Sequence, residues 1–192
     1  MSDRTLALLY PGCVSFEIAL ALELLNEKLP VETAGPPNVA RIDCAGLSVV
    51  PRHIYADVKA ADYRAILVPG GDPEVIMRDR EVDRILYEAD EQGLVIGGIC
   101  GGVLVLAKAG LTRGRRITHT YTAAHGTQEI VDATERFFEH SEFVDAPLVW
   151  DANVVTAKPD AYVEFAVEIA DRLGVLPAGG APDLAAYYRG RQ

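Results

Sequence analysis

Residues 94–110 constrain the fold of this chain most strongly, because they have the pattern of a strand, an abrupt turn and a helix. Residues 94–99 form a short apolar run with no helix breaker before Gly97, which is typical of a buried strand. Two glycines follow Cys100 at once, and an apolar helical run follows them. Such a turn strains its residue and places the side chain beside the free N–H groups of the helix start. We therefore expect Cys100 to be a reactive cysteine with a lowered pKa; the alternative is a buried, inert thiol.

The rest of the chain alternates between strand and helix patterns. Such alternation indicates an α/β fold, with a mainly parallel sheet covered by helices on both faces. The predicted strands cover residues 5–10, 31–34, 65–68, 115–118, 143–145, 148–150 and 154–157, with an antiparallel excursion over 41–50. The predicted helices cover residues 16–27, with Ser15 as N-cap, then 74–92, 123–138, 161–173 and 184–188.

Four segments are expected to meet at one edge of this sheet. In parallel α/β sheets the working site lies at the carboxyl ends of the strands. The segments that follow predicted strands there are residues 11–17, the turn at 69–71, Cys100 and the region of His119. We expect the functional site in this cluster.

Composition excludes several classes of function. The chain has 192 residues, enough for one domain with a sizeable core, and a formal net charge of -10. This charge argues against nucleic acid and against an anionic membrane surface as partners. No run approaches the ~20 apolar residues of a membrane span, and the first residues lack the pattern of a signal peptide.

The number and spacing of the cysteines indicate a reducing compartment and argue against a metal site. The chain has three of them, widely spaced and without the spacing of metal ligands. Reduced thiols in the cytoplasm are the simplest account. Cys13 is expected to line the site at the sheet edge, and Cys44 is expected to be structural.

Five short motifs occur in order along the chain at compatible spacing. They are Ser15-Phe16-Glu17-Ile18, Leu67-Val68-Pro69-Gly70-Gly71, Gly98-Ile99-Cys100-Gly101-Gly102, the segment from Ala109 to His119, and Thr156-Ala157-Lys158-Pro159-Asp160-Ala161. With these motifs the chain resembles the ThiJ/PfpI superfamily, also called the DJ-one family, of class I glutamine amidotransferase-like proteins. The resemblance implies a flavodoxin-like three-layer sandwich and a homodimer. It also implies a single domain over residues 1–192, in which residues 175–192 are a C-terminal extension.

The resemblance further implies roles for individual residues. Cys100 corresponds to the nucleophile, Glu17 to the acidic residue that hydrogen-bonds it, and His119 to a third catalytic member. The predicted oxyanion donors are Gly70, Gly71 and Gly101. The protease-like branch carries His directly after the cysteine, where this chain has Gly101, so peptidase activity is not expected. The isocyanide hydratase branch has Asp and Thr where this chain has Glu17 and Gly101.

Several of these residues have a second interpretation. Glu17 is either an exposed acidic residue in the first turn of a helix or a buried, protonated carboxyl that hydrogen-bonds a thiolate. His125 competes with His119 for the same role, and each is otherwise an ordinary imidazole. Asp72 is either a helix N-cap or a contact to a polar substrate.

These residues predict a cofactor-independent hydrolase or lyase in which Cys100 attacks a small electrophilic carbon. By resemblance, the substrate is a reactive carbonyl such as methylglyoxal, converted with water as in glyoxalase III, or its adduct on amines as in deglycases. Isocyanide hydration is the alternative chemistry. A function of another class is oxidation sensing in a stress response, in which Cys100 is oxidised to a sulfinate.

Overall fold

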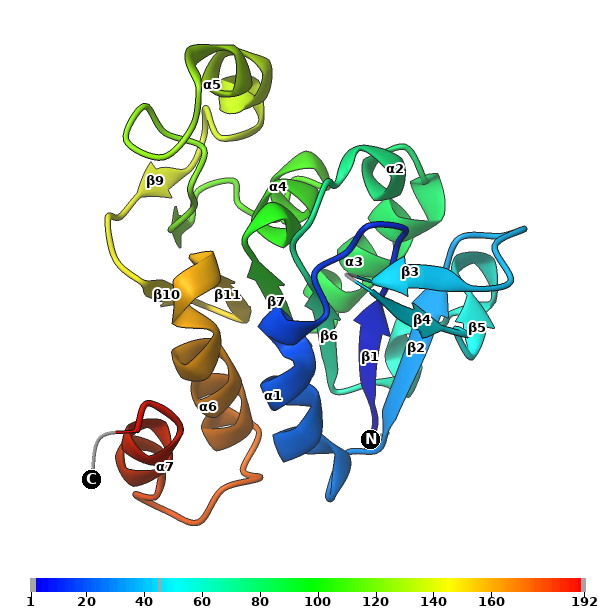
Figure 1. Cartoon of the computed structure of the whole chain (residues 1–192), viewed down its shortest axis with the longest axis vertical. Coiled ribbons are helices and arrows are strands. Elements are labelled where there is room, and N and C mark those ends of the chain that lie inside the picture. The colour runs from blue at the N-terminus through cyan, green and yellow to red at the C-terminus, as the bar shows by residue number, and fades with distance from the viewer. Residues whose placement is uncertain (1–2, 45, 191–192) are drawn as a thin grey trace.

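A sheet of seven strands forms the centre of the computed structural model, which describes residues 3–44 and 46–190 (Figure 1). Neighbouring strands pair in parallel, except for one antiparallel hairpin at the edge. The order is β10 (Leu148–Asp151), β11 (Val154–Ala157), β7 (Val95–Ile99), β6 (Ala65–Val68), β1 (Thr5–Leu8), β2 (Val31–Gly35) and β5 (His53–Ile54). The prediction of a mainly parallel sheet is confirmed.

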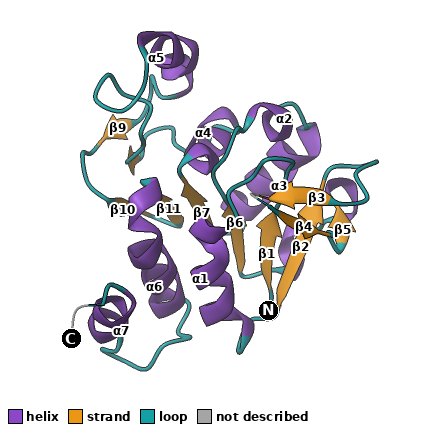
Figure 2. Cartoon of the chain, in the orientation of Figure 1, coloured by secondary structure: helices purple, strands orange, loops and turns teal. Residues whose placement is uncertain are grey.

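Helices cover both faces of this sheet (Figure 2). α1 (Phe16–Asn26) and α6 (Tyr162–Arg172) pack against each other on one face, and α3 (Arg80–Glu91) lies on the other. α4 (Gly101–Lys108) follows β7 directly. Every residue of β1, β6 and β11 is buried, because helices shield these strands on both sides. The predicted flavodoxin-like sandwich is confirmed.

Two smaller strand pairs lie outside the central sheet. The predicted antiparallel excursion is present as β3 (Ile42–Cys44) and β4 (Leu47–Val49). β8 (Arg116–Ile117) and β9 (Glu142–Phe143) pair in parallel and flank α5 (Gln128–Thr134). Figure 1 shows α5 and β9 as a lobe beyond the edge of the sheet where its parallel strands end. The remaining elements are α7 (Ala181–Tyr188), which packs on α6, and 3-10 turns at Tyr55–Asp57, Ala60–Asp62, Glu135–Phe137 and Pro159–Ala161.

The predicted helix over residues 74–92 is two helices. The first is α2 (Glu74–Met77), and α3 begins after Asp79. The carboxylate of Asp79 accepts a 2.9 Å hydrogen bond from the N–H of Glu81 and so caps a new helix start. The cap at Asp79 therefore starts a new helix, although the helical spacing of apolar residues continues through this point.

Two other local predictions differ from the structure. Ser15 does not cap α1 with its side chain; its hydroxyl donates instead to the carbonyl oxygen of Cys44, at 3.4 Å. The predicted helix over residues 123–138 is confined to α5 and the 3-10 turn after it, because Thr127 caps α5 by accepting a hydrogen bond from the N–H of Ile130.

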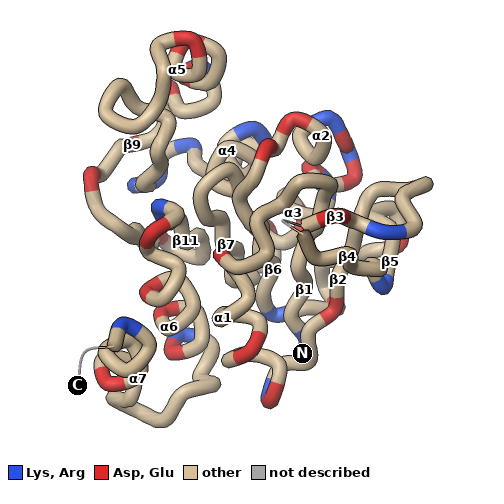
Figure 3. Tube along the Cα trace, viewed as in Figure 1, with Lys and Arg blue, Asp and Glu red and all other residues tan. Residues whose placement is uncertain are grey.

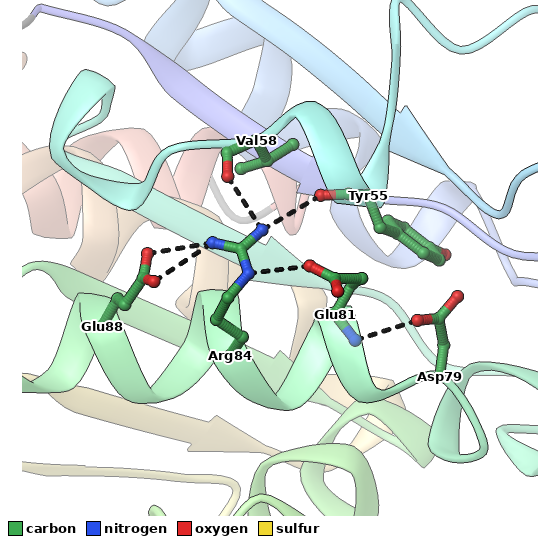
Figure 4. A network of polar contacts seen from close by, with 6 residues as sticks. All are labelled: Tyr55, Val58, Asp79, Glu81, Arg84 and Glu88. Atoms are coloured by element: carbon green, nitrogen blue, oxygen red, sulfur yellow. Dashed lines mark hydrogen bonds and ion pairs between the residues drawn. The ribbon is translucent and has the colours of Figure 1, made fainter.

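The side chain of Arg84 on α3 fastens the segment after β5 to the helix (Figure 4). Its guanidinium donates to the carbonyl oxygens of Tyr55, at 3.4 Å, and Val58, at 3.0 Å. Two carboxylates of the same helix hold it in place, those of Glu81 and Glu88. Tyr55 in turn donates from its buried hydroxyl to the carbonyl oxygen of Leu9. α3 thereby braces the chain at the carboxyl end of β1.

Basic and acidic positions are interspersed over many elements, and Lys and Arg do not gather along one of them (Figure 3). This dispersion accompanies the net charge of -10. Within residues 3–44 and 46–190, no helix combines the length and the apolar character needed to cross a membrane.

Candidate active site

Cys100 lies between the end of β7 and the first residue of α4. Its backbone has φ 55° and ψ -123°, a region that residues with a side chain rarely adopt. Its N–H donates a 3.0 Å hydrogen bond to the carbonyl oxygen of Ala157, at the end of the neighbouring strand β11. The thiol is half-buried at the carboxyl edge of the sheet. The strained strand-to-helix turn predicted from residues 94–110 is therefore present.

Glu17 is a buried carboxyl with 3% of its surface exposed, although it belongs to the first turn of α1. Its Oε2 accepts a 2.8 Å hydrogen bond from the N–H of Gly70, and its carboxyl group also shares a hydrogen bond with the side chain of Cys100. Burial raises the pKa of Glu17 above its ordinary value, and these two hydrogen bonds offset only part of that rise. The interpretation of Glu17 as an exposed first-turn residue is wrong.

Burial raises the pKa of the Cys100 thiol to about 11, so the predicted lowering is wrong. The negative charge of Glu17 and the hydrogen bond to its carboxylate raise this pKa further. The N–H groups of Gly101 and Gly71 hydrogen-bond the sulfur and lower its pKa, but they do not outweigh burial. Because burial raises the pKa of both groups, the sulfur rests as a thiol, hydrogen-bonded to the buried carboxyl group of Glu17. Glu17 therefore lies where a base can take the proton from sulfur.

Glycines let the backbone close around these two side chains. A Cβ added to Gly70 would lie 2.3 Å from Oε2 of Glu17 and 2.8 Å from Sγ of Cys100. A Cβ added to Gly101 would lie 2.4 Å from the carbonyl oxygen of Gly71. Position 101 thus has no room for the histidine of the protease-like branch. Because Glu17 engages the N–H of Gly70, the predicted oxyanion donors left facing the sulfur are Gly71 and Gly101.

Tyr10 fixes the turn at residues 69–71 from the interior. Its side chain is fully buried, and its hydroxyl lies 2.9 Å from the carbonyl oxygen of Pro69 and 2.7 Å from that of Gly70, to which it donates. No local pattern marks Tyr10 as part of the site. Its place at the end of the first predicted strand, just before Pro11, is the signal that could have found it.

The contacts of His119 are mainly aromatic. Its ring stacks on Phe138 with centroids 4.0 Å apart, and its centroid lies 4.9 Å from that of Phe143. Its Nδ1 accepts a 3.1 Å hydrogen bond from the N–H of Tyr121. Burial lowers the pKa of His119 to about 4, so the ring is neutral near pH 7. In the described part of the chain, no hydrogen bond joins His119 to Cys100.

Tyr121 brings a phenol toward the site, and sequence patterns do not mark it. Burial raises its pKa, and electrostatic interactions with Cys100, Asp72 and Glu17 raise it further, which places the phenol near all three. Asp72 itself is exposed. The N-cap residue of α2 is Pro73 rather than Asp72, although Oδ1 of Asp72 accepts a 3.1 Å hydrogen bond from the N–H of Glu74.

His125 lies on an exposed loop. Its Nδ1 is 3.1 Å from the hydroxyl of Thr122. It lines a pocket of about 400 Å³ together with Lys158 and Asp145, which form an ion pair at 2.5 Å. Across the described residues, no hydrogen bond links His125 to Cys100.

The arrangement at the sheet edge combines a thiol, a buried carboxyl group and two backbone N–H donors. These groups supply a nucleophile, a proton acceptor and a place for negative charge, which suits covalent attack on an electrophilic carbon. Among residues 3–44 and 46–190, no group of three or more His, Cys, Asp and Glu side chains is arranged to hold a metal ion.

The chain is similar in sequence and fold to several known proteins. A family model described as the DJ-1/PfpI family matches residues 3–172. An uncharacterized protein of Archaeoglobus fulgidus is 31% identical over 148 residues, which cover 76% of this chain and 83% of that protein. Deglycase TK1284 of Thermococcus kodakarensis is 27% identical over 105 residues, which cover 54% of this chain and 58% of that protein. The crystal structure of Drosophila melanogaster DJ-1beta has a TM-score of 0.78 and 25% identity, with 98% of each chain covered.

Proposed function

The chain belongs to the DJ-1/PfpI family, and on that premise we propose that it is a cysteine-dependent enzyme acting on small reactive carbonyl compounds of the methylglyoxal class. Cys100 is the nucleophile, and Glu17 is the base that accepts its proton. The similarity to a protein named as a deglycase supports this class of substrate. The enzyme works in the cytoplasm as a homodimer and needs no added cofactor.

One observation carries this proposal: the side chain of Cys100 hydrogen-bonds the buried carboxyl group of Glu17, which the N–H of Gly70 holds in place. A thiol with a raised pKa needs an adjacent base to react near neutral pH. Glu17 takes the proton as sulfur attacks the aldehyde carbon. The N–H groups of Gly71 and Gly101 stabilise the charge on the carbonyl oxygen, and the oxygen then receives the proton to give a hemithioacetal.

The remaining steps need only a proton transfer and water. Glu17 moves the proton of the former aldehyde carbon to the adjacent ketone carbon, while the hydroxyl proton of the hemithioacetal passes to the ketone oxygen, which leaves a thioester of a 2-hydroxy acid on Cys100. Water hydrolyses the thioester and restores the thiol. Methylglyoxal and water thus give lactate, with no net oxidation.

Lactate formation from methylglyoxal tests this proposal. We expect turnover by the wild-type protein, no turnover by Cys100→Ser, and unchanged turnover by the matched variant Cys44→Ser in reducing buffer. Equal lactate production by the wild-type protein and Cys100→Ser would contradict the proposal. An isocyanide offered to the same samples tests the alternative, since formamide production without lactate would assign hydration.

Oxidation sensing is a second candidate, favoured by a half-buried sulfur that two backbone N–H groups face. A sulfinate at Cys100 would place its negative charge against these donors. Peroxide treatment followed by intact-mass measurement should then add two oxygen atoms to the wild-type protein and none to Cys100→Ser. Equal uptake of oxygen by both proteins would exclude Cys100 as the sensing residue.

A further inference from the structure

Cys13 and Cys44 form a pair of thiols beside the site, outside the groups that the proposed reaction uses. Both cysteines are free and fully buried, and their sulfur atoms lie 2.7 Å apart. A disulfide bond between them, at ~2.05 Å, requires the sulfurs to approach by under ~1 Å.

Main-chain contacts hold the two cysteines opposite each other. Cys44 is the last residue of β3, and its carbonyl oxygen accepts a hydrogen bond from the hydroxyl of Ser15. The N–H of Gly12 donates a 2.8 Å hydrogen bond to the carbonyl oxygen of Asp43. The residue before each cysteine is thus tied to the other segment, so bond formation does not need the backbone to move far.

We propose that Cys13 and Cys44 are a modification site that forms a reversible intramolecular disulfide. The two thiols lose two hydrogen atoms and two electrons become available to the oxidant. With a peroxide as oxidant, hydrogen peroxide accepts them and becomes two molecules of water. With oxidised glutathione, a mixed disulfide forms first, the second thiol displaces glutathione, and two molecules of reduced glutathione leave.

Burial sets the rate of this reaction. Neither sulfur contacts solvent in the folded chain, so an oxidant reaches the pair when the β3–β4 hairpin opens locally. The buried thiol of Cys44 also has a pKa raised to about 12 by burial and by Cys13, so the reactive thiolate is scarce at neutral pH. The disulfide therefore forms slowly and, once closed, is equally shielded from reductants.

The pair is joined to the site through the backbone. Cys13 forms an isolated antiparallel bridge with Gly71, and the N–H of Val14 donates a 2.9 Å hydrogen bond to the carbonyl oxygen of Gly70. A covalent bond from Cys13 to β3 thus braces the turn that serves the site. The expected effect is a more stable protein with its loop 11–15 anchored at both sides.

The variant Cys100→Ser isolates this pair, because Cys13 and Cys44 are then the remaining thiols of the chain. The full-length variant is incubated with oxidised glutathione at several redox ratios, unfolded, and treated with iodoacetamide. We expect two labels in the reduced protein and none after oxidation. Trypsin should then release residues 5–28 and 42–52 as one disulfide-linked product. The oxidised form should melt roughly 5–10 °C higher than the reduced form.

The matched controls are Cys13→Ser and Cys44→Ser in the same background, each of which should keep one label after oxidation. Retention of both labels at every redox ratio would overturn the proposal. So would a stable glutathione adduct on either thiol, or a disulfide between two chains in place of the linked peptides. None of these measurements depends on carbonyl turnover, so the result is distinct from the test of the proposed function.

Discussion

The N–H of Gly70 donates a 2.8 Å hydrogen bond to Oε2 of Glu17. This contact joins the turn after β6 to the first turn of α1. Each of these two segments also hydrogen-bonds Cys100, the first through the N–H of Gly71 and the second through the side chain of Glu17. The carboxylate is therefore oriented toward the sulfur before any substrate binds, which lowers the entropic cost of proton transfer.

Glu17→Gln should abolish most of the turnover. The amide keeps an oxygen that accepts from the N–H of Gly70, but it cannot take the proton of Cys100. We expect kcat/KM for methylglyoxal to fall by about 10²–10⁴-fold, with a melting temperature near that of the wild-type protein. An unchanged kcat/KM would rule out Glu17 as the base.

Alkylation of Cys100 by iodoacetamide should accelerate with pH up to about pH 11, where its thiol ionises. Near pH 7 the thiolate fraction is about 10⁻⁴ for a pKa this high. Glu17→Gln removes a negative charge, so it should lower the pKa of Cys100 and speed alkylation at pH 7 while turnover falls. Cys100→Ser is the control, since the other two thiols are buried. A wild-type rate that reaches its plateau below pH 8 would contradict the raised pKa.

Gly101→Ala should destabilise the protein, although alanine favours helices. Its Cβ would lie 2.4 Å from the carbonyl oxygen of Gly71, and the crowded turn should cost about 1–3 kcal/mol of unfolding free energy. Gly126→Ala is the matched control, because its Cβ would meet its nearest atom at 3.6 Å. Denaturant unfolding compares the two variants. Equal unfolding midpoints would show that the turn accommodates the added methyl group.

Arg84→Ala should cost about 1–2 kcal/mol of unfolding free energy, because two carbonyl oxygens lose their charged donor. Arg78→Ala is the matched control. Its ion pair with Glu74 is exposed on both sides, and its removal should change the unfolding free energy by less than about 0.5 kcal/mol. Similar losses for the two variants would mean that Arg84 does not brace the segment after β5.

The turn at Cys100 is predictable from sequence because its signals are local. An apolar run, a cysteine and two glycines follow one another, and the structure folds them into β7, the strained residue and α4. The antiparallel β3–β4 hairpin is predictable for the same reason, since a single turn joins the two strands. The partner of Cys100 lies far away in the sequence, so local patterns do not identify it. Glu17 is predicted from the family resemblance and not from periodicity.

Properties set by distant segments escape local patterns. The helix start favours a thiolate at Cys100, but burial and a carboxylate from α1 reverse the direction of the pKa shift. His119 likewise follows a strand at the expected edge, yet Phe138 and Phe143 enclose its ring from the lobe of α5 and β9. Such environments exist only after the chain has folded, so spacing along the sequence does not reveal them.

The positive φ of Cys100 makes the stability of the fold and the reactivity of the site conflicting requirements at this one position. A side chain in this conformation costs on the order of 1–3 kcal/mol, and glycine adopts the same backbone without that strain. Among replacements at this position, glycine would therefore give a chain that resists unfolding better but has no sulfur to react. If the reaction were no longer under selection, replacement of Cys100 by glycine would give a more stable protein without the nucleophile.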